Sequence, residues 1–143
     1  MTEEIFDVVD ADDRVIDQQP RSEVHRLGLR HRAIHLLVFN AAGELFLQKR
    51  SMKKDCFPGT WDSSASGHVD SGEDYDICAL REPFEELGLK LETVPQRLFK
   101  QAITPPSRSD RMLIAYESRS NQICSWHAST EQFPSADFYV IVD

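Results

Sequence analysis

The sequence feature that most constrains the fold is a run of acidic residues, glycines and one arginine, placed at fixed intervals between positions 67 and 89. The run reads GHVDSGEDYDICALREPFEELGL. Near its start, Ser71 and Asp74 make the Ser-x-x-Asp pattern that often opens a helix. Gly88 stands where such a helix would end, because glycine readily adopts the left-handed conformation that closes helices. We therefore predict a helix from Asp74 to Leu87.

The predicted helix has an apolar face and an acidic face, at about 100° per residue. The apolar face expected to meet the core consists of Ile77, Leu80, Phe84 and Leu87, and the acidic face consists of Glu82, Glu85 and Glu86. Three carboxylates within one turn repel one another in water, and a bound cation reverses that effect. Mg²⁺ takes oxygen ligands and commonly uses one or two carboxylates together with substrate phosphates. A solvated acidic face is the alternative interpretation of such a cluster.

Two further residues of the helix affect its acidic face. Arg81 lies next to Glu82 and four residues before Glu85, so it can fix a carboxylate rotamer and offset part of the negative charge. Pro83 removes the backbone hydrogen bond to Ala79 and costs about 3 kcal/mol inside an ideal helix. We therefore expect the helix to kink or to start a new turn at Pro83, which would move the carboxylates relative to one another.

The spacing of eight residues in this run resembles the Nudix box. The matching positions are Gly67, Glu73, Arg81, Glu82, Glu85, Glu86, Gly88 and Leu89. The resemblance implies an α/β (α+β) fold: the Nudix α/β/α sandwich, with a mixed β-sheet and a catalytic loop and helix. It also implies a hydrolase that depends on Mg²⁺ or Mn²⁺ and acts on nucleoside diphosphates linked to another moiety.

The resemblance also implies roles for individual residues. The three glutamates and the Gly67 carbonyl would hold the metal, and one of the glutamates, which the sequence does not identify, would act as the general base. Arg81 would orient the glutamates. Glu73 would support the loop or an outer metal.

Length and charge limit the chain further. Its 143 residues suit one domain, 1–143, rather than two. A formal net charge of -8 argues against general nucleic-acid binding, which needs a basic surface. The sequence has no apolar run of membrane-spanning length and no signal-peptide pattern, and its three cysteines lack the spacing of a metal site or disulfide framework. We expect a cytoplasmic protein.

Apolar patterns outside the run predict strands. A hairpin is expected over 4–17, with a polar turn at residues 10–13 that matches a calcium loop only loosely. The other expected strands are Ala33 to Phe39, Glu44 to Lys49, Lys90 to Val94, Arg97 to Ala102 and Met112 to Glu117. The tail over 121–143 is short and unlike the end of related chains, and it leaves no room for a long helix.

The segment before the run is the basic exception in an acidic chain. Arg50 and Lys54 lie here, directly after a predicted strand. In this position they would hold a diphosphate opposite the metal, because guanidinium and ammonium groups bind phosphate oxygens. A solvated basic loop is the alternative interpretation.

A wider stretch, from residue 25 to residue 72, resembles the Nudix branch that contains isopentenyl diphosphate isomerase and its bacterial hydrolase-like relatives. The matching pieces are EVHRLGLRHRAIH, NAAGEL and LFLQKRSMKKDCFPGTWDSSASGH. By this resemblance His25, His31 and His68 would hold a second metal, and the two cations of the basic segment would grip the diphosphate. Structural histidines hydrogen-bonded within the fold are the alternative.

Two departures from that branch argue against isomerisation. Ser66 stands where the isomerase has its catalytic cysteine, and a serine hydroxyl is far too weak an acid to replace a tuned thiol. The isomerase also uses two carboxylates on a later strand, where the segment from Ser109 to Tyr116 offers Asp110 alone. We therefore favour hydrolysis of a small-molecule diphosphate, with neither nucleic acid nor membrane as a partner and with a homodimer left open. A catalytically weak Nudix domain that binds or regulates is the alternative, and isomerisation is less favoured.

Overall fold

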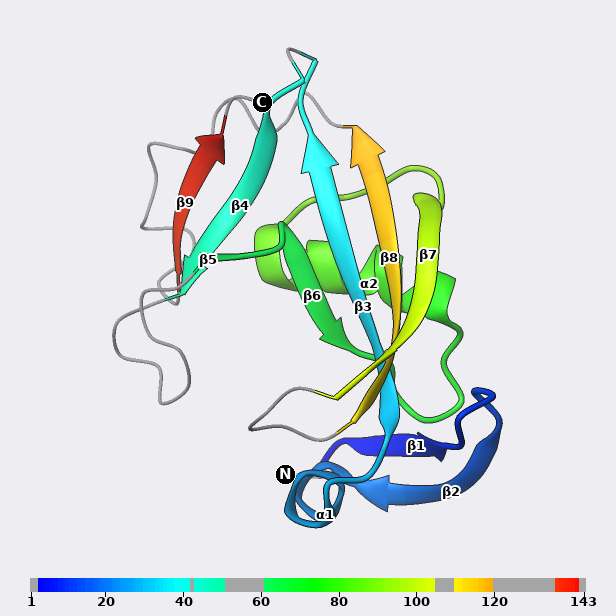
Figure 1. Cartoon of the computed structure of the whole chain (residues 1–143). Helices are drawn as coiled ribbons and strands as arrows, with labels where there is room; N and C mark the ends of the chain where they lie inside the picture. The colour runs from blue at the N-terminus through cyan, green and yellow to red at the C-terminus, as the bar shows by residue number, and fades with distance from the viewer. Residues whose placement is uncertain (1–2, 42, 51–60, 105–109, 120–135, 142–143) are drawn as a thin grey trace.

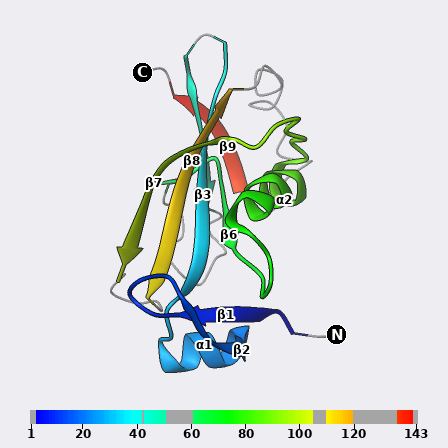
Figure 2. The ribbon, with the colours of Figure 1, turned by 90° about the vertical axis from the view of Figure 1, so that its right-hand side faces the viewer.

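The computed structural model describes residues 3–41, 43–50, 61–104, 110–119 and 136–141, which form one mixed sheet and two helices (Figures 1 and 2). The strands are β1 (Ile5–Val9), β2 (Val15–Pro20), β3 (His31–Phe39), β4 (Leu45–Arg50), β5 (Trp61–Asp62), β6 (Ala65–His68), β7 (Gln96–Ile103), β8 (Arg111–Arg119) and β9 (Ala136–Ile141). The helices are α1 (Arg21–Leu27) and α2 (Tyr75–Leu87). Neither helix in this described part is long and apolar enough to cross a membrane.

Strand β3 organises the sheet. On one edge it runs parallel to β8 along its whole length, from His31 opposite Arg111 to Phe39 opposite Arg119. On the other edge it meets β1, β6 and β4 in turn, all antiparallel. β7 pairs with β8, β2 with β1, and both β5 and β9 pair with β4. This mixed sheet with helices is the predicted fold class, and the tail contributes β9 to it.

Helix α2 lies against one face of the sheet and closes the main core (Figure 2). Its ends follow the sequence signals: the Asp74 side chain accepts a hydrogen bond from the Asp76 amide, and Gly88 closes the helix with φ of 66°. The Gly88 amide bonds the Phe84 carbonyl at 2.9 Å, and the Leu89 amide bonds the Pro83 carbonyl at 3.1 Å. The predicted helix is therefore confirmed at both ends.

The buried face of α2 differs from the predicted one. Ile77 and Phe84 are 54% and 58% exposed, so two of the four expected core residues point to solvent. The residues of α2 that are buried are Tyr75, Cys78, Ala79, Pro83 and Leu87. Four of these repeat every fourth residue, which places them on one side of the helix. The prediction was wrong because it counted large aliphatic and aromatic side chains and overlooked the tyrosine, alanine and proline of the true face.

Pro83 does not divide the helix. α2 continues through it without interruption from Tyr75 to Leu87, and the proline is buried on the face toward the sheet. The expectation of a new turn at this position is therefore wrong. Burial of the apolar ring against the core offsets part of the cost of the missing hydrogen bond.

The strand predictions were confirmed except for one. The N-terminal hairpin, β3, β4, β7 and β8 lie at or within a few residues of their expected places. No strand forms at residues 90–94, which connect α2 to β7. Leu89 and Leu91 pack into or against the core, whereas Lys90, Glu92 and Val94 are exposed. The alternation there reflects a connecting segment anchored by two leucines.

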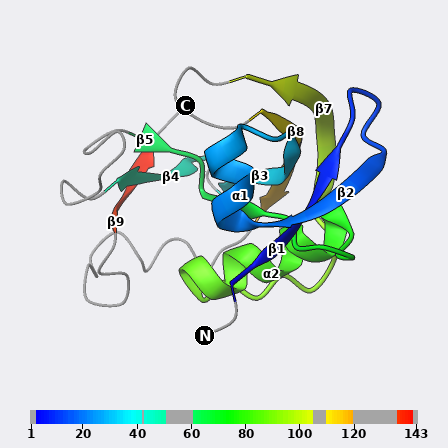
Figure 3. The same cartoon turned by 90° about the horizontal axis from the view of Figure 1, so that it is seen from below.

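Viewed from the α1 end, the N-terminal hairpin crosses the end of the sheet and reaches the loop before α2 (Figure 3). Phe6 of β1 forms an isolated antiparallel bridge with Asp70 of that loop. Asp10 closes the turn of the hairpin by accepting hydrogen bonds from the amides of Asp12 and Arg14, each at 2.9 Å. The hairpin thus brings the chain's N-terminal part to the segment that carries the acidic cluster.

Candidate active site

The first feature of the site is the close approach of α2 to the end of β6. Gly67 pairs with Ile34 of β3, and the Glu82 side chain lies directly over this glycine. A Cβ atom at position 67 would come within 2.0 Å of the Glu82 carboxyl carbon. Any larger residue would therefore have to displace the Glu82 carboxylate, so glycine here makes a cradle for that group.

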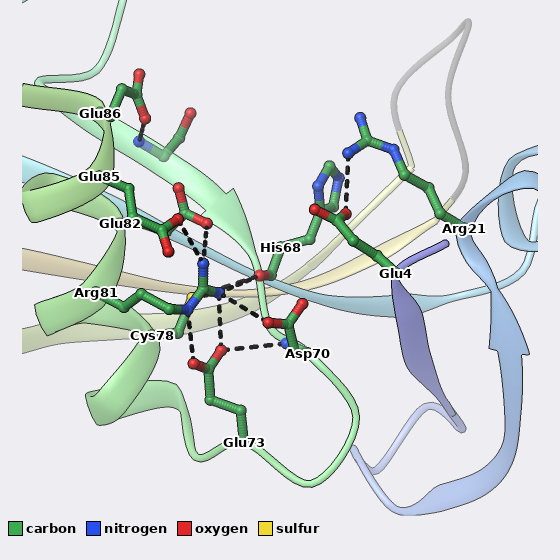
Figure 4. Close-up of polar contacts among 11 residues, drawn as sticks. Glu4, Arg21, His68, Asp70, Glu73, Cys78, Arg81, Glu82, Glu85 and Glu86 are labelled. Carbon is green, nitrogen blue, oxygen red and sulfur yellow. Dashed lines mark hydrogen bonds and ion pairs between the residues drawn. The ribbon is translucent and has the colours of Figure 1, made fainter. Parts of the chain in front are cut away.

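Arg81 is the centre of the polar contacts around this cradle (Figure 4). Its Nε and Nη2 atoms donate to the two carboxylate oxygens of Glu73, at 2.7 and 2.9 Å. Its Nη1 atom donates to Glu82 at 2.8 Å and to Glu85 at 3.0 Å, and Nη2 also reaches the His68 carbonyl at 3.1 Å. The guanidinium thus sets the positions of two of the predicted metal ligands relative to the loop, with geometry that a lysine could not reproduce.

The charges of this group are strongly perturbed. Burial raises the pKa of Glu82 to about 7, with the Glu86 carboxylate adding to the rise and Arg81 opposing it. Burial alone would also raise the pKa of Glu73, but the hydrogen bonds from Arg81 outweigh it and the pKa is lowered. The bonds to Glu73 in turn hold the pKa of Arg81 above its usual value. An ion pair therefore anchors one end of the cluster, while burial disfavours the charged form of Glu82 at the other.

Glu86, the third predicted metal ligand, also points from α2 toward β6. Glu86 lies 3.4 Å from the Ser66 amide, next to the cradle, and Glu85 is the most exposed of the three. In the described part of the chain, no three imidazole, thiol or carboxylate groups converge closely enough to hold a metal as they stand. Arg81 lies between two of the glutamates instead. The donor set is nonetheless all oxygen, and the cradle at Gly67 leaves room for it, so the residues fit a hard divalent cation.

A second cluster, of three histidines, lies beside the first. The ring centroids of His31 and His68 are 5.0 Å apart, and the His25 ring stands edge-on to both at 5.6 and 5.7 Å. The Phe6 ring stacks on His31 and His68, at 5.4 and 5.0 Å. These three histidines come from α1, β3 and β6, and the structure brings together all the residues named for a second metal site.

His31 has a defined tautomer. Its Nδ1 atom lies 3.2 Å from the Leu29 carbonyl, which can only accept, so Nδ1 carries the proton. Burial lowers the pKa of His31 to about 4, and it lowers that of His68 further, so both rings are neutral near pH 7. The Nε2 atom of His31 is buried and has no hydrogen-bond partner among the described residues. It therefore presents a free lone pair within the cluster.

Comparison with known families shows the family to which the chain belongs. The model of the NUDIX domain matches residues 29–136, most of the chain. This chain belongs to the Nudix family. A Nudix hydrolase of Streptomyces coelicolor is 41% identical over 68% of this chain and 54% of its own length. A Deinococcus radiodurans protein of known crystal structure is similar over 97% of this chain and 83% of its own, with a TM-score of 0.69 and 26% identity.

The isomerase branch is represented among the relatives too. A Serratia proteamaculans protein named isopentenyl-diphosphate Delta-isomerase is 39% identical over 63% of this Nudix chain and 50% of its own length. The chain spans about half the length of curated relatives such as the Streptomyces coelicolor protein and a Pseudomonas aeruginosa Nudix hydrolase. The family and the fold are therefore established, and the likeness to this branch agrees with the sequence resemblance.

Some predicted residues of the Nudix site cannot be placed. Lys54 lies outside the described residues, and so does the side chain of Arg50, whose backbone ends β4. Ser66 lies on β6 beside Gly67, with its amide toward Glu86. Asp110, the acid that directly precedes β8, pairs with Arg30 at 3.8 Å.

Two buried aspartates that support the site were missed in the sequence. Asp7 is 6% exposed in β1 and accepts bonds from Ser71 and Gly72 of the Nudix loop. Asp13 is 9% exposed at φ of 64°, and it bonds Arg32 and the hydroxyl of Tyr75, the first residue of α2. An acid flanked by Phe6 and Val8 was a readable signal for Asp7. Asp13 carried no such signal, because it belongs to a turn rich in aspartate.

Proposed function

We propose that this Nudix domain hydrolyses a phosphoanhydride bond with the help of a divalent cation. The substrate class is a nucleoside diphosphate linked to another moiety, or a related small-molecule diphosphate. The observation that carries the proposal is the Glu82 carboxylate held over Gly67 by Arg81, which is itself gripped by both oxygens of Glu73. A merely solvated acidic face has no need of a glycine cradle or of a partly buried arginine paired with several carboxylates.

The metal would be held by the carboxylates of Glu82, Glu85 and Glu86 together with the Gly67 carbonyl. When bound there, Mg²⁺ or Mn²⁺ supplies Lewis acidity, which neutralises phosphate charge and makes water a better nucleophile. One of the three glutamates accepts the proton of the attacking water. Arg81 keeps the carboxylates in place before substrate arrives, which lowers the cost of organising the site.

Binding of the diphosphate would rest on local cations, since the chain as a whole carries a charge of -8. We assign this task to Arg50 and Lys54, which follow β4 in the sequence. The same overall charge disfavours nucleic acid as a substrate, because a polyanion needs an extended basic surface. A small diphosphate requires only a few positive groups.

The test is a panel of nucleoside diphosphate derivatives and prenyl diphosphates, assayed for phosphate or nucleotide release with Mg²⁺ or Mn²⁺. We expect metal-dependent turnover of at least one class, reduced by about 10²- to 10⁴-fold in Glu86→Gln. Glu92→Gln removes an exposed acid of the segment after α2 and serves as the matched control. Absence of turnover from a folded protein that still binds the cation would overturn the proposal and favour a binding domain.

We propose the histidine cluster as a second, different metal site, which its rings would complete by turning toward one another, since they do not converge on one point as they stand. The buried Nε2 lone pair of His31 and two neighbouring imidazoles suit a borderline cation such as Zn²⁺ or Co²⁺ better than Mg²⁺. The bond from Nδ1 to the Leu29 carbonyl orients the ring in the manner common for metal-bound histidines.

Calorimetric titration with Co²⁺ or Zn²⁺ tests the second site. We expect His31→Gln to weaken binding at least tenfold and His35→Gln, which changes a histidine further along β3, to leave it unchanged. Equal binding by wild type and His31→Gln would show that the cluster is a structural stack.

A further inference from the structure

The N-terminal hairpin makes direct contact with the Nudix loop, and the contact is unusually specific. The Ser71 amide donates to the Ile5 carbonyl at 2.8 Å, which adds a backbone bond beside the bridge between Phe6 and Asp70. The Ser71 hydroxyl donates to one oxygen of Asp7 at 2.8 Å, and the Gly72 amide approaches the other at 3.2 Å. Both oxygens of one buried carboxylate thus hold two consecutive loop residues.

This carboxylate is placed where burial is expensive. Asp7 is 6% exposed, and a buried carboxylate is tolerated only when donors satisfy it. Asp7 also accepts a hydrogen bond from the side-chain Nε2 atom of Gln18 in β2, at 3.3 Å. Asp7 is the one acid of β1, whose other side chains are all apolar. The reason for a buried acid at this position therefore lies in the loop residues that it binds, Ser71 and Gly72.

Those loop residues lead directly to the carboxylates of the site. Glu73 follows Gly72, and its Oε1 atom accepts from the Asp70 amide at 3.2 Å, which closes the loop. Glu73 then grips Arg81 by two bonds, and Arg81 bonds Glu82 and Glu85. A continuous series of short contacts thus runs from β1 to the proposed metal ligands.

We propose that Asp7 is a positioning residue for the Nudix site, acting through Ser71, Gly72 and Glu73 on the orientation of Arg81. Two-bond pairing between an arginine and a carboxylate tolerates little displacement, and a shift of about 1 Å in a catalytic group can cost 10²-fold in rate. Asp7 touches neither substrate nor metal. Asp7 fixes the loop in the position at which both carboxylate oxygens of Glu73 accept hydrogen bonds from the Arg81 guanidinium.

The variants are Asp7→Asn, which keeps the shape and removes the charge, and Ser71→Ala, which removes one of the donors to Asp7. Asp12→Asn is the matched control, because Asp12 lies exposed in the turn of the same hairpin. The first measurement is the Arg81 Nε–H resonance in a ¹H–¹⁵N spectrum of each metal-free protein. We expect this signal to shift in Asp7→Asn and, by less, in Ser71→Ala, and to stay in place in Asp12→Asn.

The second measurement is kinetic and rests on the proposed hydrolysis. We expect Asp7→Asn to lower kcat about tenfold while KM changes less than about twofold. In the background of Glu73→Gln the same substitution should lower kcat less than about twofold, because residues that act through one another are not additive. A purely structural role would give additive losses in the two backgrounds.

The two measurements separate the two proposals. An Arg81 signal unmoved in both folded variants, or additive kinetic losses, would overturn the positioning role of Asp7. If wild type turns over none of the diphosphates, the proposed hydrolysis fails instead. The Arg81 signal then still decides whether Asp7 positions the site, and Ser71→Ala provides the test if Asp7→Asn does not fold.

Discussion

The last turns of α2, which carry Glu82, Glu85 and Glu86 and are called the carboxylate turn below, lie beside the histidine cluster. The two groups stabilise their ionisable side chains in opposite ways. Gly67 and His68 are adjacent in β6, yet Gly67 serves the first group and the His68 ring the second. The carboxylate turn keeps its groups near Arg81, which compensates negative charge by direct pairing. The histidine cluster uses burial, which holds His31 and His68 neutral. Charge pairing thus organises one group, and suppression of charge organises the other.

The difference predicts different ligands for the two groups. Carboxylate oxygens suit Mg²⁺ and Mn²⁺, whereas neutral imidazoles suit cations such as Zn²⁺. The His68 carbonyl accepts a hydrogen bond from Arg81 (Figure 4). The His68 ring stacks in the histidine cluster, so this residue touches both groups. The proximity therefore raises the question of whether the two groups are energetically independent.

The substitution expected to have the largest effect is Gly67→Ala. The new methyl group would displace the Glu82 carboxylate, because its carbon would stand 2.0 Å from the carboxyl carbon of that residue. Loss of one ligand from its place should lower hydrolysis at least about 100-fold, with Co²⁺ binding by the histidines unchanged. Steady-state kinetics and calorimetry measure the two effects. Gly43→Ala, which strains the backbone at φ of 79° in the turn between β3 and β4 but meets no neighbour, controls for loss of stability alone. A matching loss of Co²⁺ binding in Gly67→Ala would show that the groups are coupled.

Arg81→Lys should have the next largest effect. A lysine keeps the positive charge but cannot pair with both oxygens of Glu73 while reaching Glu82, so kcat should fall about 30-fold. Glu73 is mostly buried, and leaving it imperfectly paired should cost about 2 kcal/mol in the free energy of unfolding, measured by urea denaturation. Arg26→Lys, on an exposed ion pair of α1, is the matched control. Full activity in Arg81→Lys would mean that charge alone organises the turn.

The histidine cluster should show its neutrality in the pH dependence of stability. The unfolded chain takes up a proton on His31 below about pH 6.5, while the folded pKa is about 4. The stability that His31 confers as a neutral ring is therefore complete above pH 7 and is lost as pH falls from about 6.5 to 4. We expect His31→Phe to reduce this loss by about 3 kcal/mol, measured by urea denaturation in chelator at each pH. Parallel curves for the two proteins over this range would mean that His31 is not held neutral.

The smallest effect is expected for Pro83→Ala, on the buried side of the carboxylate turn. The alanine restores a backbone donor to the Ala79 carbonyl but removes part of a buried ring, so the two effects oppose each other. We expect the free energy of unfolding to rise by less than about 1 kcal/mol and kcat to change less than about threefold. Thermal unfolding and kinetics measure these changes. A large rise in kcat would show that the proline, and not Arg81, limits the arrangement of the glutamates.

The spacing of residues in the sequence was sufficient to predict the helix α2 and its acidic face. Asp74 and Gly88 mark the ends of α2, and the interval between Glu82 and Glu86 places both on the side toward β6. These relations depend on the geometry of a single helix, which repeats every 3.6 residues whatever surrounds it. The family's fold class followed from the same spacing by resemblance, and the mixed sheet confirmed it.

Distant contacts were beyond such reasoning. The apolar periodicity of the sequence predicted that Ile77 and Phe84 lie in the core, but both are exposed. Periodicity does not specify on which side of α2 the sheet lies. Lys90 to Val94 alternated like a strand but had no partner to pair with among the described strands. Strand formation needs a neighbouring edge, and a connecting segment with the same alternation cannot be distinguished in sequence.

By itself the sequence determined the carboxylate helix, its caps, the arginine within reach of the glutamates and the family to which the chain belongs. The tertiary structure alone decided that three histidines from α1, β3 and β6 would meet, and that Asp7 of β1 would hold the loop 64 residues later. The physical reason is that helix geometry acts between near neighbours in the chain. Pairing of β1, β6 and β8 around β3 joins residues far apart, and only the folded sheet specifies which of them meet.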